Sequence, residues 1–134
     1  MSMNPVVHFE MPAKDKKRVA EFYKTAFGWG MNDMNMGDQS YLMAQTTKTD
    51  KQGMVQTPGA INGGFFDFKN EEGFNVPHLV ISVENLEEAM AAVKANSGTI
   101  SGEPMDIPGI GKYASFKDTE GNGVGMLQPN PREK

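Results

Sequence analysis

The chain contains no cysteine among its 134 residues, and this absence removes several classes of chemistry. A disulfide framework, a thiolate metal cluster and a cysteine nucleophile are all excluded, so any metal ion has to be held by histidine, carboxylate or amide side chains. Histidine is also scarce, with only His8 and His78 in the whole chain. A site that uses imidazole therefore has to use one or both of these residues.

Long hydrophobic runs and an excess of basic residues are missing as well. No uncharged apolar stretch approaches the roughly 20 residues that span a bilayer, and the start "MSMNPVVHFE" lacks the regions of a secretory signal. The formal net charge of -4 and the pI near 5.1 give no support for nucleic acid or an anionic membrane as a partner. We expect a cytoplasmic protein of one domain, residues 1–134.

Methionine, in contrast, is plentiful, with 11 in the chain. Thioether side chains are pliable and polarisable, so one interpretation is a pocket that adapts to an apolar ligand. The other interpretation, which the composition favours, is a hydrophobic core filled with methionine.

The sequence repeats its own pattern at an offset of about 70 residues. In both copies an apolar strand is followed by a helix-capping residue, by apolar residues at helical spacing and by a glycine that ends the helix. The aligned pairs are Val6 with Val76, His8 with His78, Asp15 with Asn85, Lys24 with Lys94 and Gly28 with Gly98. We therefore predict two modules, at about residues 5–69 and 75–129.

Three further strands are predicted after each helix, because turn residues punctuate the remaining sequence. They are "WGMNDMNMG", "SYLMAQ" and "GAINGGFFDF" in the first module, and "TISGEPMDI", "KYASFKD" and "NGVGMLQP" in the second. The turn "DTEGN" predicts that the last two strands form an antiparallel hairpin. Residues 46–59 show no periodicity, so we interpret them as an inserted surface loop or a lid.

Side chains alternate across a strand, which divides each predicted first strand into two faces. In the first module His8 and Glu10 share one face, and the other face is wholly apolar. In the second module His78 lies on the face opposite Leu79 and Ile81. The apolar faces suit the amphipathic helices, so both histidines are expected to point away from them. If the two sheets curve toward each other, the histidine faces line a shared cleft, where small-molecule sites usually form.

The motif "EFYKTAFGW" and the ending "IPGIGKYASFKDTEGNGVGMLQP", taken with the repeat order, resemble the vicinal oxygen chelate superfamily. Its members include glyoxalase I, extradiol dioxygenases, fosfomycin-resistance proteins and bleomycin-binding proteins. The resemblance extends from about Val6 to Pro129 and is nearest to an uncharacterised bacterial branch related to lactoylglutathione lyase. It implies an α+β fold of tandem βαβββ modules that form a curved, mostly antiparallel sheet around a shared cleft, and it implies a homodimer.

Metal-dependent members of the superfamily place one ligand on the first strand and another on the last strand of each module. His8 and His78 fit the first-strand positions, since each lies seven residues before a helix cap. At the last-strand positions, where a glutamate is usual, this sequence has Gly125 in the second module and Gly63 or Gly64 in the first. A glycine has no side chain to coordinate a metal, so both expected carboxylates are missing.

Two functions stay open on this basis. In the first, the cleft binds a small, partly apolar molecule without a metal, as in a protein like the bleomycin-resistance proteins. In the second, Glu10 joins His8 and His78 as ligand or base in a glyoxalase-like lyase or dioxygenase-type enzyme that uses zinc, nickel, iron or manganese. Several aromatic residues are candidates to stack against a ligand, with core packing as the alternative explanation. They are Trp29, Tyr41, Phe65 and Tyr113.

Overall fold

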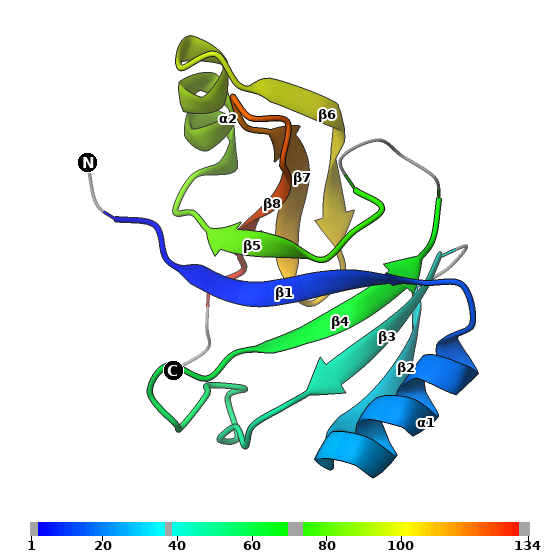
Figure 1. The fold of residues 1–134 in the computed structure, drawn as a ribbon. Coiled ribbons are helices and arrows are strands. Elements are labelled where there is room, and N and C mark those ends of the chain that lie inside the picture. The colour runs from blue at the N-terminus through cyan, green and yellow to red at the C-terminus, as the bar shows by residue number, and fades with distance from the viewer. Residues whose placement is uncertain (1–2, 37–38, 70–73, 132–134) are drawn as a thin grey trace. The chain divides into compact units, whose positions relative to one another are not determined.

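The computed structural model describes residues 3–36, 39–69 and 74–131, and it confirms an α+β fold with two βαβββ halves (Figure 1). The first half contains β1 (Val6–Ala13), α1 (Lys16–Phe27), β2 (Gly30–Met36), β3 (Gln39–Gln45) and β4 (Asn62–Asp67). The second half contains β5 (His78–Ser82), α2 (Leu86–Ala95), β6 (Thr99–Ile107), β7 (Gly111–Lys117) and β8 (Gly123–Pro129). Every strand and helix expected from the repeat is present.

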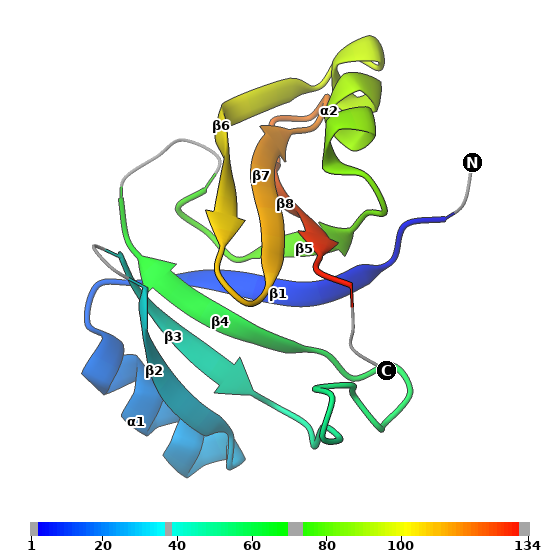
Figure 2. The same cartoon turned by 180° about the vertical axis from the view of Figure 1, so that it is seen from behind.

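The strands of each half follow the same order. It is β2-β3-β4-β1 in the first half and β6-β7-β8-β5 in the second (Figure 2). The first and last strands of each half, β1 with β4 and β5 with β8, pair in parallel, and the other neighbours pair antiparallel. The predicted mostly antiparallel sheet is therefore confirmed for each half.

Two compact units make up the chain, and their boundary falls inside β1. The N-terminal unit comprises residues 8–77, and the C-terminal unit comprises residues 1–7 and 78–134. The backbone N–H of Ser82 donates to the carbonyl of Pro5 at 2.9 Å, which joins the first residues of the chain to β5. The single domain of our sequence interpretation and the cleft between modules stay predictions.

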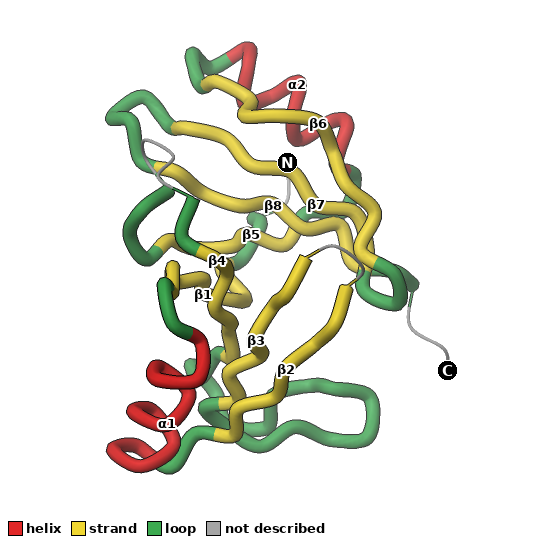
Figure 3. The backbone as a smooth tube through the Cα atoms, turned by 90° about the vertical axis from the view of Figure 1, so that its right-hand side faces the viewer, coloured by secondary structure: helices red, strands yellow, loops and turns green. Residues whose placement is uncertain are grey.

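Each helix begins at the residue that the sequence indicates. The Asp15 side chain accepts the backbone N–H of Arg18 at 3.0 Å, and the Asn85 side chain accepts that of Glu88 at 2.9 Å. Both are N-caps, which satisfy donors that a helix start leaves without intrahelical partners. Gly28 then ends α1 in the left-handed conformation, with φ of 72°. Figure 3 shows the two helices in red, each beside the strands of its own half.

The end of α2 corrects one prediction. The left-handed residue is Ser97, with φ of 72°, and not Gly98. Gly98 is needed for a different reason, because a side-chain carbon built there would lie 2.6 Å from the Cγ1 atom of Val93 and 3.2 Å from the carbonyl oxygen of Lys117. This glycine permits a close approach between the helix end and β7.

The two hydrophobic cores lie on the faces that the alternation predicts, except that Leu79, at the start of β5, is 49% exposed and outside the core. In the N-terminal unit, Phe9 and Met11 of β1 pack with the buried Leu42, Ala44 and Phe65, and α1 covers them. The core of the C-terminal unit contains residues from β5, α2, β7 and β8. They include Ile81, Leu86, Ala114 and Met126, together with Val83 directly after β5. His8 and His78 consequently lie on the strand faces that point away from the helices.

The loop from β3 to β4 contains a turn that the sequence pattern of residues 46–59 did not predict. The Oδ1 atom of Asp50 accepts the backbone N–H groups of Gln52 and Met54, each at 2.9 Å. In the β7–β8 hairpin, Asp118 accepts the N–H groups two and four residues later at the same distance. The two halves therefore share this aspartate-bound turn, and the loop of the first half is a hydrogen-bonded structure.

Within the described ranges, no helix is long and apolar enough to cross a membrane.

Candidate ligand-binding site

His8 forms a hydrogen bond with a tyrosine from the neighbouring part of its own sheet. Its Nε2 atom lies 2.9 Å from the hydroxyl oxygen of Tyr41 on β3, and both side chains are half-buried. Residue His8 pairs with Asn62 of β4, and the next residue on the same face, Glu10, pairs with Gly64. We call the side of this sheet that carries His8, Glu10, Tyr41 and Gly64 the His8 face.

Burial changes the protonation of this histidine. It lowers the pKa of His8 from the ordinary value of 6.5, and the Glu10 carboxylate opposes that effect less strongly. His8 is therefore a neutral imidazole near pH 7, with one nitrogen as donor and the other as acceptor. The Tyr41 hydroxyl can bond either form of Nε2, because a hydroxyl both donates and accepts.

The glycine beside Tyr41 explains how the ring reaches His8. A side-chain carbon built at Gly64 would lie 2.1 Å from the Tyr41 hydroxyl oxygen and 2.2 Å from its Cζ atom. Such distances are far inside van der Waals contact, so the tyrosine occupies the space in which a side chain at position 64 would begin. Any larger residue at this position would displace the ring.

The C-terminal unit repeats this arrangement. A carbon built at Gly125 of β8 would lie 2.3 Å from the hydroxyl oxygen of Tyr113 on β7. Gly125 pairs with Val80 of β5, as Gly64 pairs with Glu10 of β1. Since Glu10 and Val80 are equivalent in the repeat, Gly64 is the partner of Gly125, and the sequence alternative Gly63 is excluded as its equivalent.

Gly63 lies on the opposite side of β4. A carbon built there would lie 2.5 Å from ring atoms of Phe9, which belongs to the core under α1. Its lack of a side chain serves helix-side packing, so Gly64 alone is the position on the His8 face.

The His8 face does not fit a divalent metal. The expected carboxylate position is Gly64, its side-chain space holds the Tyr41 ring, and the Nε2 atom of His8 already bonds the Tyr41 hydroxyl. Zinc, nickel and iron sites need several anionic or imidazole ligands around one point. Among the residues that the structure describes, no three His, Asp or Glu side chains gather closely enough to hold a metal ion.

The remaining predicted contacts fall into two groups. Tyr113 is half-buried on the side of the C-terminal sheet that also carries Val80 and Gly125. His78 lies two residues before Val80 in β5, so it is on the same side of the strand, and it is 9% exposed. We call this side the His78 face. Trp29 and Phe65 lie on the helix side of the N-terminal unit, where the core accounts for both. Phe65 is 1% exposed, and the ring of Trp29 stacks on α1.

The equivalence of the two tyrosines had a signal in the sequence. An offset of 72 residues aligns "YLMAQ" with "YASFK", and so places Tyr41 on Tyr113. The offset of 70 that aligns the histidines misses this pair, because the connections between strands differ in length.

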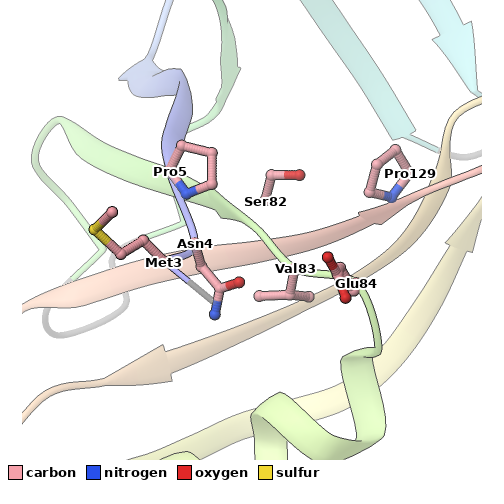
Figure 4. Close-up of a pocket in the computed structure, with 7 residues that line it drawn as sticks. All are labelled: Met3, Asn4, Pro5, Ser82, Val83, Glu84 and Pro129. Carbon is pink, nitrogen blue, oxygen red and sulfur yellow. The ribbon is translucent and has the colours of Figure 1, made fainter. Parts of the chain in front are cut away.

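A pocket of about 390 Å³ lies elsewhere, on the C-terminal unit (Figure 4). It is formed by the start of the chain and by the ends of β5 and β8. The lining residues are Met3, Asn4, Pro5, Ser82, Val83, Glu84 and Pro129. None of the predicted site residues lines it. Met3 is 97% exposed, so one wall is an open segment, and we assign this pocket no function.

The fold defines a class of proteins, and comparison with known families identifies it. Residues 6–126 match the model of the "Glyoxalase/Bleomycin resistance protein/Dioxygenase superfamily". The chain belongs to this superfamily, as the resemblance in its sequence indicated.

Relatives of known sequence carry related names. A "Glyoxylase-like domain-containing protein" of Didymella fabae is 28% identical over 116 residues, which cover 84% of each chain. A "Putative glyoxylase CFP32" of Mycobacterium bovis is 30% identical over 56 residues. That match covers 42% of this chain and 22% of the mycobacterial protein, so the chain spans about a fifth of the relative's length.

Solved structures share the fold at low identity. The structure of a Streptomyces coelicolor methylmalonyl-CoA epimerase variant in complex with 2-nitronate-propionyl-CoA has a TM-score of 0.71 and 13% identity, with 99% of both chains covered. A hypothetical protein of Bacillus halodurans C-125 has a TM-score of 0.68 and 15% identity at the same coverage. At these sequence identities the similarity to the solved structures concerns the fold alone.

Proposed function

We propose that this protein binds a small, partly apolar organic molecule without a metal ion, at the histidine faces of its two modules. One observation carries the proposal. Tyr41 fills the position where a metal-dependent relative would present a carboxylate, and its hydroxyl bonds the nitrogen of His8. This exchange replaces a negatively charged ligand with an aromatic ring and a neutral hydroxyl, which suit an organic molecule better than a cation.

The apolar surroundings of the pair also support this function. Met43 pairs with Gly64 and Phe66 pairs with Tyr41, and both side chains are half-buried on the His8 face. Pockets for small molecules combine such apolar surface with a few polar groups that fix orientation. The superfamily gives further support, since the solved epimerase binds an organic ligand on the same fold.

The proposal includes a homodimer and leaves catalysis to experiment. A light-scattering mass of two chains is the expected result, and a mass of one chain contradicts the dimer. A glyoxalase-like lyase or dioxygenase-type enzyme with His8, His78 and Glu10 at a metal is the competing function, and the test below separates the two.

A thermal-shift screen of metabolites and antibiotics, run in the presence of a chelator, tests the proposal. A molecule that binds the native state selectively raises the apparent stability in a saturable way. We expect at least one such molecule, with a smaller shift for His8→Gln, which removes the imidazole. Lys112→Gln is the matched control, because Lys112 is exposed on β7, and it should respond as the unaltered protein does.

The contradicting result would come from a parallel screen without chelator, in which divalent cations are added. If divalent cations stabilise the protein and organic molecules do so only in their presence, metal-free binding is wrong and the competing enzyme gains support.

A further inference from the structure

The tyrosine on each histidine face has the same neighbours in both units. In the N-terminal unit the strand pairing sets Met34 on one side of Tyr41 and Phe66 on the other. In the C-terminal unit Met105 and Leu127 flank Tyr113 in the same way. The equivalent residues of the two units are therefore Met34 and Met105, Tyr41 and Tyr113, and Phe66 and Leu127. Directly paired residues point to the same side of a sheet, so each tyrosine side chain has a methionine on one neighbouring strand and a second apolar side chain on the other.

These neighbours remain in part accessible. Met34 and Phe66 are half-buried, and Met105 is 41% exposed. Methionine adapts its shape and makes favourable contacts with aromatic rings, and its repetition beside both tyrosines favours a flat aromatic group over a branched aliphatic one. The composition favoured methionine in the core, but these two methionines lie on the side away from the helices.

The charges on the His8 face restrict the ligand further. Burial keeps His8 neutral by lowering its pKa, and Glu10 places a carboxylate on the same face. A carboxylate or phosphate on the ligand would be repelled by Glu10 and would find no cationic partner in His8. The hydroxyl of Tyr41, a donor and an acceptor, suits an uncharged oxygen.

Building on the proposed function, we propose that Tyr41 and Tyr113 determine specificity, and that the ligand is an uncharged aromatic compound with a carbonyl or hydroxyl oxygen. The aromatic part lies against the methionine beside each tyrosine, and the oxygen exchanges a hydrogen bond with the tyrosine hydroxyl. This assignment concerns the class of ligand and the residues that select it.

Three probes of similar size separate the contributions of the aromatic ring and of the oxygen to binding. Acetophenone has an aromatic ring and a carbonyl oxygen. Ethylbenzene has the aromatic ring without the oxygen, and cyclohexyl methyl ketone has the carbonyl oxygen without an aromatic ring. Protein labelled with ¹³C at the methionine methyl groups is titrated with each compound. The signals of Met34, Met43 and Met105 are assigned from single Met→Leu variants, which the packing tolerates well.

We expect saturable shifts of these methyl signals. Acetophenone should bind about fivefold tighter than ethylbenzene, the range of one neutral hydrogen bond. It should also bind tighter than cyclohexyl methyl ketone by about the same factor, the range of a methionine–aromatic contact. Tyr41→Phe and Tyr113→Phe keep the rings and remove the hydroxyls. Each substitution should weaken the binding of acetophenone to its own histidine face and leave the binding of ethylbenzene there unchanged. Tyr23→Phe is the matched control, because Tyr23 stacks on Trp29 at a centroid distance of 4.5 Å on the helix side, and it should bind as the unaltered protein does.

Equal affinities for the three probes, no shift of the three methyl signals, or unchanged binding by both hydroxyl-free variants would overturn this assignment. If the chelator screen still yields a stabilising molecule, the proposed function stands while the assignment fails. If that screen yields none, both fail.

Discussion

A side-chain carbon at Gly64 would lie 2.1 Å from the hydroxyl oxygen of Tyr41, and the same conflict, at 2.3 Å, exists between Gly125 and Tyr113. The two glycines therefore make room for two rings that come from neighbouring strands. The conflict between each glycine and its tyrosine can be tested by adding a single methyl group.

We predict that Gly64→Ala lowers the free energy of unfolding by about 1–3 kcal/mol, the usual range for overpacking a well-packed site. The Tyr41 ring has to rotate away, and its hydrogen bond with His8 is lost. Urea unfolding followed by the fluorescence of Trp29, which packs against the N-terminal core, measures the change. Gly30→Ala is the control, since its nearest contacts lie at an ordinary 3.6 Å.

The loss of stability caused by Gly64→Ala should depend on Tyr41. In a Tyr41→Ala background, Gly64→Ala has no ring to displace, so its effect should fall to that of the Gly30→Ala control. An undiminished effect in the double variant would mean that the conflict with Tyr41 is not its cause.

The stability should depend on pH through His8. Burial lowers the pKa of His8 in the folded protein, so between that pKa and 6.5 the unfolded chain binds more protons. Acidification through this window therefore lowers the free energy of unfolding. Urea unfolding at about pH 7.5 and about pH 5.5 should show a decrease that is smaller in His8→Gln. A decrease of equal size in both proteins would assign the pH dependence to other groups.

The turn at Asp50 predicts a local effect. Its carboxylate accepts the backbone N–H groups of Gln52 and Met54, so Asp50→Ala should accelerate hydrogen exchange at these two amides. Exchange at Asn122, which belongs to the equivalent turn at Asp118, should not change. If the amides of Gln52 and Met54 exchange at their original rates, the side chain does not hold the turn.

Local signals in the sequence predicted most of the fold. Asp15 and Asn85 cap the helices, Gly28 ends the first helix, and the turn "DTEGN" joins β7 to β8 as expected. These features depend on neighbouring residues, so a single chain segment carries enough information for them. Ser97 is an exception, because a left-handed serine next to a glycine gives no distinctive pattern.

The site could be predicted only in part. Alternation placed His8 and Glu10 on one face because a strand has a period of two. The partner of His8 was not accessible in this way. Tyr41 reaches His8 through the pairing of β3 with β4 and of β4 with β1, and the loop between β3 and β4 hides the register. The choice between Gly63 and Gly64 depended on the same register.

The central claim is that the histidine faces bind organic molecules and not a metal, and titration calorimetry with Zn²⁺ and Ni²⁺ tests it most directly. The protein is first freed of metal with a chelator, and His8→Ala is titrated beside it. We predict no stoichiometric binding of either cation, and no difference between the two proteins, because Tyr41 occupies the carboxylate position and bonds His8. Binding of about one cation per chain that disappears in His8→Ala would contradict the account.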